Sequence, residues 1–471
     1  MKTIFRSSVL AAAALVLAGC ASVNIDQTLD ETNTATQDFT QGKLELSRSA
    51  QQREARAKLS AELLAQPLDM NAAVQLALAN SPAVQTLLAQ GWADMAQADR
   101  GARIANPVFT FERMRLGDEL EIGRLLSFGL LDLLSLPQKR AISSSQVAQA
   151  RVQLSANVIE QLTQTRQAWV RAVAAQQALE YARQVNTSAQ ASAELAKRMQ
   201  QVGNFNKLQR MRQQVFYADA TAQLAASQHA ATASREELTR LLGLTDGQAM
   251  QLKLPDRLPE LPKEPRQPQN ISSRASDQRL DVLMARQQLD AAGKSQGLNL
   301  LTSLVDVELG LRHDTVFDNA AASKSNKKGF ELGIRLPIFD WGAASRDVMN
   351  AQSLAAASRY ESTVRSASSQ LRESYSAYRT AYDLARHYQG EIVPLRKAMA
   401  EENVLRYNGM LIGVFELLAD NREQINSVIA AIKSFEQFWL ADAALAASMT
   451  GKPVNTMMAA PATNGGEAAA H

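Results

Sequence analysis

The sequence predicts an α+β membrane protein whose chain supplies four β-strands and several very long α-helices. Four segments alternate apolar and polar residues with the period of two typical of strands that have one apolar face. Helical segments far longer than a single core requires follow each pair of strands. The same order of elements occurs twice, which predicts two internal structural repeats.

Composition excludes some classes of partner. The 471 residues include 50 Lys and Arg against 47 Asp and Glu, for a net charge of +3. No large basic excess is available for phosphate, so nucleic acid is not an expected partner. Apolar residues make up 46% and aromatic residues 5% of the chain, and Ala, Gln, Leu and Ser dominate, as in long packed helices.

The N-terminus predicts a signal peptide over residues 1–19, in which Lys2 and Arg6 precede a short apolar core. It ends in Leu17-Ala18-Gly19-Cys20, which resembles the cleavage box of bacterial lipoproteins. Cys20 is the only cysteine of the chain. We therefore expect a covalent lipid such as palmitate on Cys20, which would anchor the chain stably. A plain signal peptide with an incidental cysteine is the alternative.

The chain up to the middle predicts a leader and a first repeat. Residues 20–66 are polar and are expected to form an extended, lipid-anchored leader. Repeat 1 covers 67–254, and its first helix should begin near Asp69 or Asn71, one of which caps it. A β-hairpin is expected at about 106–136. The first helix should extend to about 105, with a kink at Ser81-Pro82. After the hairpin we expect two long helices, over about 138–202 and 206–242, joined by a turn near Gly203.

The second half repeats this order after a Pro-rich linker at 255–275. Repeat 2 covers 276–450, with a helix to about 293 and a β-hairpin at about 301–341 that contains a polar loop at 314–328. A long helix pair turning near Gly409 follows, and its first helix carries apolar residues at a mean spacing of 3.5, typical of a coiled-coil seam. Gly203 and Gly409 lie 206 residues apart. The tail, 451–471, is expected to be disordered.

The strands set a condition on assembly. A sheet in a membrane must close, because unpaired backbone groups in lipid are costly, and four strands are too few for a barrel with a lumen. Several copies must therefore combine. A soluble sheet packed on helices remains the alternative. The polar faces of the strands are the candidate lumen lining, with these residues: Glu112, Glu119, Glu121, Asp306, Glu308, Arg312, Glu331 and Arg335.

Short motifs in a fixed order give the sequence a family resemblance. They begin with Pro67-Leu68-Asp69-Met70-Asn71-Ala72-Ala73-Val74 and continue through Ser81-Pro82 and Asn106-Pro107. Later motifs are Arg279-Leu280-Asp281-Val282, Gln288-Leu289-Asp290-Ala291-Ala292, Leu336-Pro337-Ile338-Phe339-Asp340-Trp341-Gly342 and Tyr407-Asn408-Gly409. In this order, over roughly 67–450, the sequence resembles the TolC-type outer-membrane efflux channels and looks like a lipoprotein member of that family.

The resemblance implies a homotrimer in the bacterial outer membrane. Three chains would form a twelve-stranded transmembrane β-barrel, continued by an α-helical barrel that crosses the periplasm and opens at its tip like an iris. It also implies a passive conduit that works with a periplasmic membrane-fusion adaptor and an inner-membrane transporter. A periplasmic coiled-coil scaffold lipoprotein is the alternative function. Neither the exported substrate nor the class of pump follows from the sequence.

The family's adaptor-contacting tips fall on the two glycine turns. The matching residues are Val202, Gly203, Asn204, Gly409, Met410, Leu411 and Ile412. Some members carry an acidic, cation-binding ring just after the second turn. Here only Glu416 and Asp420 are acidic in that neighbourhood, so this ring is not expected.

Catalytic patterns are missing from the sequence. Its four histidines, His229, His313, His387 and His471, have no metal-ligand spacing. The chain contains no phosphate-cradling glycine loop. We therefore expect no enzyme activity, no metal and no cofactor beyond the lipid on Cys20.

Overall fold

The computed structural model describes residues 24–40, 42–267, 279–302, 306–318, 320–335 and 342–452. The predicted signal peptide, the predicted lipidation site Cys20, the end of the Pro-rich linker, the segment 336–341 and nearly all of the predicted tail lie outside the described residues. The described chain divides into two compact units. One contains Leu88–Ser155 and Leu280–Ser366, and the other contains Leu29–Leu87, Ala156–Arg279 and the chain from Ala367 onward.

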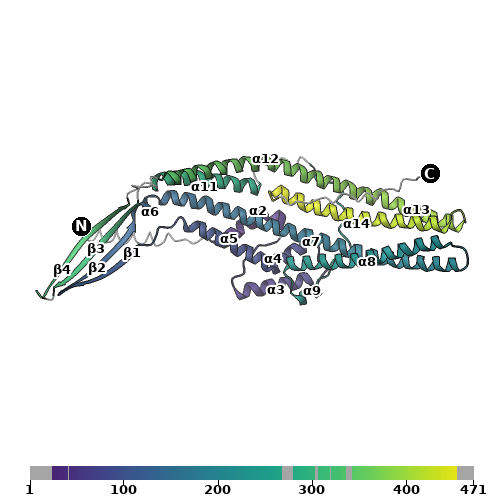
Figure 1. The fold of residues 1–471 in the computed structure, drawn as a ribbon, viewed down its shortest axis with the longest axis horizontal. Coiled ribbons are helices and arrows are strands. Elements are labelled where there is room, and N and C mark those ends of the chain that lie inside the picture. Colours follow the sequence, from purple (N-terminus) through teal and green to yellow (C-terminus); the bar gives the residue numbers. More distant parts are fainter. Residues whose placement is uncertain are drawn as a thin grey trace. The chain divides into compact units, whose positions relative to one another are not determined.

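The first unit carries a four-stranded antiparallel sheet in the order β1-β2-β3-β4 (Figure 1). Its strands are β1 (Val108–Leu116), β2 (Glu119–Gly129), β3 (Asp306–Asp318) and β4 (Ser323–Arg335). Both hairpin turns lie at one end of the sheet. At the other end the strands adjoin the helices α5 (Pro82–Arg100), α6 (Leu130–Leu134), α11 (Leu280–Thr302) and α12 (Ala343–His387). Among the described residues of this unit, no helix covers either face of the sheet.

The second hairpin differs from its prediction. The prediction of a polar loop at 314–328 is wrong, because β3 and β4 pair continuously from Asp306↔Arg335 to Asp318↔Ser323. The expected hairpin start at 301 is also early, because α11 continues to Thr302. The polar run pairs because ladder hydrogen bonds satisfy the backbone of any residue except proline, so exposed strands do not need apolar side chains.

The second unit is built around long helices with a core near Trp169. Parts of α5, α12 and α7 (Leu136–Gln201) belong to this unit and parts to the first. Its other described α-helices are α2 (Ile25–Thr40, from Leu29), α3 (Ala50–Leu64), α4 (Met70–Asn80), α8 (Lys207–Leu242), α9 (Asp246–Gln251), α13 (Val393–Asn408) and α14 (Val414–Thr450). Trp169 of α7 is fully buried, and its Nε1 donates to the Leu68 carbonyl at 2.7 Å. Leu76, Val173 and Leu242 belong to the same apolar cluster. Asp69 caps α4 by accepting from the Ala72 N–H, so of the two predicted caps it is Asp69 that acts.

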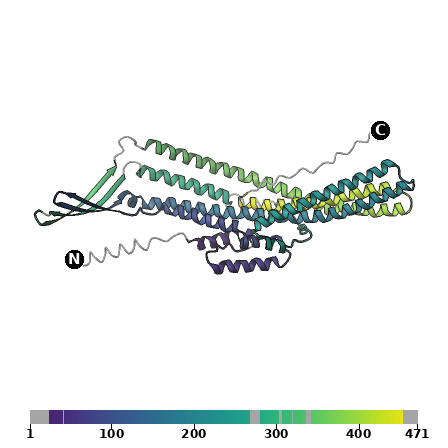
Figure 2. The ribbon, with the colours of Figure 1, turned by 60° about the horizontal axis from the view of Figure 1, so that its bottom comes forward.

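The described part of the polar leader is largely helical, so the prediction of an extended segment at residues 20–66 is wrong. α2 and α3 are helical, and α3 has a capping box formed by Ser49 and Gln52 (Figure 2). Phe39 and Leu44 are buried, and the Arg166 guanidinium lies 4.4 Å from the centre of the Phe39 ring. A few apolar residues in polar sequence are enough to dock a helix when a larger surface is available to receive them.

The described part of the Pro-rich linker is held against helices. Tyr382 of α12 donates to the Pro262 and Lys263 carbonyls at 3.1 Å, and Trp439 of α14 donates to the Pro259 carbonyl at 3.1 Å. Tyr382, Tyr378 and Phe438 form the buried aromatic cluster beneath it. The described part of the linker, 255–267, is therefore packed against α12 and α14 of the second unit.

Two helical runs of equal length recur along the chain. α7 has 66 residues, and the run from Ala343 to Asn408 has the same length, being α12, a single π-helical turn η1 (Tyr388–Ile392) and α13. α12 begins 207 residues after α7, and α14 begins 207 residues after α8. At ~1.5 Å per residue each run is about 100 Å long. Among the described helices, none has both the length and the apolar character needed to cross a bilayer.

Candidate functional site

The sheet has two chemically distinct faces. Residues directly opposite each other in an antiparallel ladder share a face, so the register assigns every strand position to one of the two. The row Glu112–Gly123–Asp314–Lys327 defines what we call the acidic face. The next row, Phe111–Arg124–His313–Lys328, defines the apolar face, named for its largest group of residues.

The acidic face collects all eight predicted lumen positions. By register these are Glu112, Glu119, Glu121, Asp306, Glu308, Arg312, Glu331 and Arg335. The side chains of Asp306 and Arg335 lie outside the described part of the structure. Every acidic position of the four strands falls on this face, including Asp314 and Asp318, which the sequence reading had not singled out.

Arg312 is the centre of the polar contacts on the acidic face. Its guanidinium reaches Asp314 at 2.8 Å, Glu331 at 2.9 Å and Glu112 at 3.3 Å. The contact with Glu112 crosses the intervening strand β2 over Gly123, where a Cβ would lie 3.2 Å from Asp314 Oδ1. Glycine there leaves room for the ion cluster, which joins β1, β3 and β4 through side chains.

The apolar face exposes large side chains. Phe109 is 63% exposed and Phe330 is 74% exposed. The helix-proximal part of this face consists of Phe109, Leu126, Phe128, Val307, Leu309, Leu311, Phe330, Leu332 and Ile334. A contiguous exposed apolar surface of this kind marks a contact with lipid or protein. The outer edges of β1 and β4 also have no strand partner among the described residues.

The first helical turn lies between α7 and α8. It has five residues, 202–206, and Gly203 adopts φ +81°, a left-handed conformation. The N–H of Asn204 donates to the Met199 carbonyl at 2.9 Å, which closes the end of α7. Asn206 then caps α8 by accepting from the Gln209 N–H. Val202 is 70% exposed.

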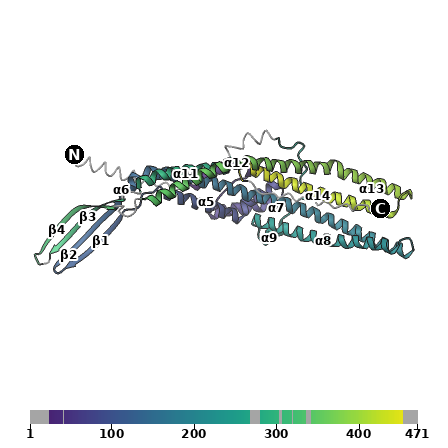
Figure 3. The same ribbon diagram turned by 45° about the horizontal axis from the view of Figure 1, so that its top comes forward.

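The second turn has the same length, 409–413, between α13 and α14. Its left-handed residue is Met410, at φ +58°, and not Gly409. Met410 and Leu411 are 92% and 77% exposed. The structural counterpart of Gly203 is therefore Met410, 207 residues away, and the sequence pairing of Gly203 with Gly409 was off by one residue. Figure 3 shows both turns at the same end of the two hairpins.

Comparison with known proteins gives this geometry a family context. Residues 271–400 match the family model described as outer membrane efflux protein. The resemblance to outer-membrane efflux channels read from the sequence is confirmed. Proteins of this family are transport conduits, which supports the expectation that the chain is no enzyme and needs no cofactor.

Solved structures show the same fold as the chain. A membrane protein from Pseudomonas aeruginosa is 20% identical over 83% of this chain and 93% of that one, with a TM-score of 0.65. The outer membrane protein VceC of Vibrio cholerae is 15% identical over 84% and 96%, with a TM-score of 0.66. The MtrE channel of Neisseria gonorrhoeae, in its open state, is 18% identical over 85% and 91%, with a TM-score of 0.63. No curated protein matches the sequence.

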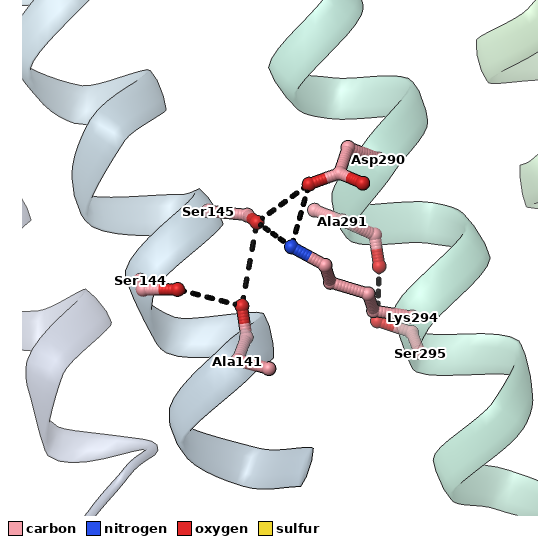
Figure 4. A network of polar contacts seen from close by, with 7 residues as sticks. All are labelled: Ala141, Ser144, Ser145, Asp290, Ala291, Lys294 and Ser295. Carbon is pink, nitrogen blue, oxygen red and sulfur yellow. Dashed lines mark hydrogen bonds and ion pairs between the residues drawn. The ribbon is translucent and has the colours of Figure 1, made fainter.

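A polar network that the sequence did not reveal connects α11, in the segment that matches the efflux family model, to α7 in the preceding half of the chain. Ser145 of α7 donates to Asp290 of α11 at 2.9 Å, and Lys294 contacts both at 2.7 Å (Figure 4). Hydrogen bonds from Lys294 and Ser145 lower the pKa of the Asp290 carboxyl. The only sequence signal was the four-residue spacing of Asp290 and Lys294, typical of a helix surface pair.

A second set of contacts joins the two helical hairpins near their turns. Arg422 of α14 donates to Gln213 Oε1 at 3.1 Å and to the Arg212 carbonyl at 3.3 Å on α8. Its guanidinium lies 4.2 Å from the centre of the Phe216 ring. Asp420, one of the two acidic residues near this turn, is bonded by Asn403 of α13. Among the described residues, no cluster of His, Cys, Asp or Glu could hold a metal ion.

Proposed function

We propose that this chain is the outer-membrane channel of a tripartite efflux or secretion system, a passive conduit that receives its cargo from a periplasmic adaptor and an inner-membrane transporter. The observation that carries the proposal is the sheet: one face is apolar and exposed, the other is acidic, and both edges are open. Lipid can cover the first face and a water-filled lumen the second. The efflux family match supports this reading.

Closure of the edges requires other copies, and we propose a homotrimer. β1 runs antiparallel to β4, so β4 of one copy can pair with β1 of the next and keep the whole barrel antiparallel. With strands spaced ~4.8 Å and tilted ~40°, a four-stranded barrel would have a backbone diameter of about 8 Å, which the side chains would fill. A twelve-stranded barrel would have a diameter of about 24 Å. Twelve strands leave a lumen, and the acidic face would line it.

The long helices would form a tunnel across the periplasm. The two runs of 66 residues, each followed by a five-residue turn, support two structural repeats per chain. Together with α8 and α14, they would give twelve long helices in a trimer. A lipid on Cys20 would add a second attachment to the membrane. The exposed tip residues Val202, Met410 and Leu411, at the ends of the hairpins, are the proposed contacts of the adaptor.

Opening at the tip would separate the two hairpins of a chain, and Arg422 is the contact that would have to break. It joins α14 to α8, that is, one hairpin to the other. Arg396 instead pairs with Glu423 at 3.3 Å, joining α13 to α14 within a single hairpin. Substituting each arginine separately therefore tests whether the contact between the two hairpins keeps the tip closed.

The experiment is conductance of the purified protein in planar phospholipid bilayers. We expect Arg422→Ala to raise the open fraction roughly 5- to 30-fold, since losing contacts worth about 1–2 kcal/mol shifts a two-state equilibrium by that factor. Arg396→Ala should leave it near the parent value. Absence of conductance in every variant, together with extraction of the protein as a soluble elongated particle, would contradict the channel and favour the scaffold lipoprotein.

A further inference from the structure

The acidic residues of the sheet all lie on one of its faces. All eight acidic positions of the four strands belong to the acidic face, and none belongs to the apolar face. The apolar face instead carries five permanent cations, which we call the basic rim: Arg113, Arg115, Arg124, Lys324 and Lys328. His313 lies in the same row as Arg124 and Lys328.

The basic rim occupies one end of the apolar face. The row Phe109–Leu126–Leu311–Phe330 and the rows nearer the helices contain only apolar side chains. The next rows toward the hairpin turns contain Arg124 with Lys328, then Arg113, then Arg115 with Lys324. From the first to the last of these rows is four residues, about 13 Å along a strand. The rim is therefore a band beside the turns, contributed by β1, β2 and β4.

No carboxylate neutralises the rim within the described structure. Arg124 donates to Thr315 Oγ1 at 3.4 Å, Arg115 to the Gly117 carbonyl at 3.4 Å, and the Lys324 ammonium lies 5.3 Å from the centre of the Phe317 ring. These are weak or neutral contacts. A neighbouring copy cannot supply the missing charge on this face either, because the strands of every copy have their acids on the other face.

The rim also stands where other anchoring residues are missing. Membrane barrels commonly mark the lipid–water boundary with Trp and Tyr. The four described strands contain neither residue, and their aromatic residues are all Phe. Long Lys and Arg side chains can take this role by laying their stems along apolar surface and extending their charged ends to the headgroups.

We propose that the basic rim binds the phosphate groups of lipopolysaccharide in the outer leaflet. The inference rests on the proposed function, which places the apolar face in lipid and the helices in the periplasm. The hairpin turns then lie at the outer surface, where the lipid A part of lipopolysaccharide carries its phosphates. Arginine matches phosphate with two parallel hydrogen bonds, and three of the five rim cations are arginines. Each protomer would present its own set.

The test compares lipid retention by the full-length protein and a rim variant. Five substitutions, Arg113→Gln, Arg115→Gln, Arg124→Gln, Lys324→Gln and Lys328→Gln, remove the charge and keep most of the side-chain length. Lys327→Gln is the matched control, because Lys327 is next to Lys328 on β4 but belongs to the acidic face. Each protein is reconstituted in phosphatidylcholine vesicles containing lipopolysaccharide, or phosphatidylglycerol at equal charge, and the bound lipid is counted by native mass spectrometry.

The expected result is at least a fivefold loss of bound lipopolysaccharide in the rim variant, no loss in Lys327→Gln, and weaker retention of phosphatidylglycerol than of lipopolysaccharide by the parent. Equal lipopolysaccharide binding by parent and rim variant would overturn the inference, as would equal retention of both lipids by the parent. If the rim variant does not fold, Lys324→Gln with Lys328→Gln on the exposed strand β4 replaces it, and the same outcomes apply.

Conductance in phosphatidylcholine alone separates this inference from the channel itself. If the parent protein inserts and conducts but does not prefer lipopolysaccharide, the channel proposal holds and the proposed binding of lipopolysaccharide by the basic rim is wrong. A parent protein that neither inserts nor conducts overturns both.

Discussion

At the scale of single residues, the two helical turns place different amino acids at the same left-handed backbone position. The second position of each five-residue turn is left-handed, and it is Gly203 in one turn and Met410 in the other. A left-handed backbone costs an L-residue with a side chain roughly 1–2 kcal/mol, and glycine escapes this cost. The first turn is relaxed and the second is strained.

We expect Gly203→Ala to destabilise the first turn by about 1 kcal/mol. A Cβ at Gly203 would meet no atom within 4 Å, so the cost would be purely conformational. Hydrogen exchange of the amides at 203–205 should speed up about fivefold. Gly247→Ala in α9 is the control, since a Cβ there also meets nothing and its backbone is not left-handed. Equal acceleration by both variants would count against the conformational explanation.

The converse change at the second turn should be stabilising. Met410 is 92% exposed, so Met410→Gly loses almost no buried surface while it relieves the left-handed backbone. We expect a gain of up to about 1 kcal/mol, seen as slower exchange of the Leu411 amide, which donates to the Arg406 carbonyl at 2.9 Å. Unchanged or faster exchange would show that the turn carries no removable strain.

At the scale of elements, much of the fold followed from periodicity. Alternation in a strand fixes which side chains share a face, so the six described predicted lumen side chains fell together on the acidic face without any knowledge of the register. Helix length followed from the absence of breakers between Pro137 and Gly203. What periodicity could not supply were contacts that depend on distant segments, such as Trp169 with Leu68 or Tyr382 with Pro262.

The leader and the second turn show where local reasoning failed. Residues 25–64 look too polar to pack, yet Leu29, Phe39 and Leu44 are buried because neighbouring helices provide the apolar surface. Pairing Gly203 with Gly409 relied on residue identity, whereas the equivalent position is set by the five-residue turn and falls on Met410. Backbone conformation outweighs residue type when the turn length is fixed.

The network between α7 and α11 predicts a pH dependence. Hydrogen bonds from Lys294 and Ser145 lower the pKa of Asp290 in the folded chain, so the carboxylate contributes stability above its unfolded pKa of about 3.9 and loses it as the pH falls through the lower folded value. The Asp290 side chain is half exposed, which limits the effect to that of a surface pair.

We therefore expect protection of the α11 amides, corrected for intrinsic exchange, to fall about 1.5- to 5-fold between pH 5 and pH 2. Asp290→Asn should abolish this change. Asp99→Asn, which removes the ion pair with Arg103 on the α5 side and leaves α7–α11 intact, should not. A pH response of α11 that survives Asp290→Asn would assign it to other carboxylates.

At the scale of the whole molecule, the sheet is a part that requires other copies. Its edges have no strand partner among the described residues, no described helix of its unit covers its apolar face, and all its carboxylates lie on the other face. A soluble protein would have to hide the apolar face against a layer of its own. A membrane barrel exposes it to lipid and uses the acidic face for water.

Whether lipid or water covers the apolar face can be measured by placing a charge in the middle of its purely apolar rows. Leu332 is 53% exposed and belongs to the purely apolar rows of β4. If the face lies in lipid, Leu332→Arg should cost roughly 2–4 kcal/mol per protomer, whereas a face in water would tolerate arginine at almost no cost. Urea unfolding of the protein folded in phosphatidylcholine vesicles measures the difference. Gly333→Arg, next to Leu332 on the same strand but on the acidic face opposite Glu308, should cost far less in the lumen. Equal costs for the two variants would mean that lipid does not distinguish the faces, and the barrel would have to be abandoned.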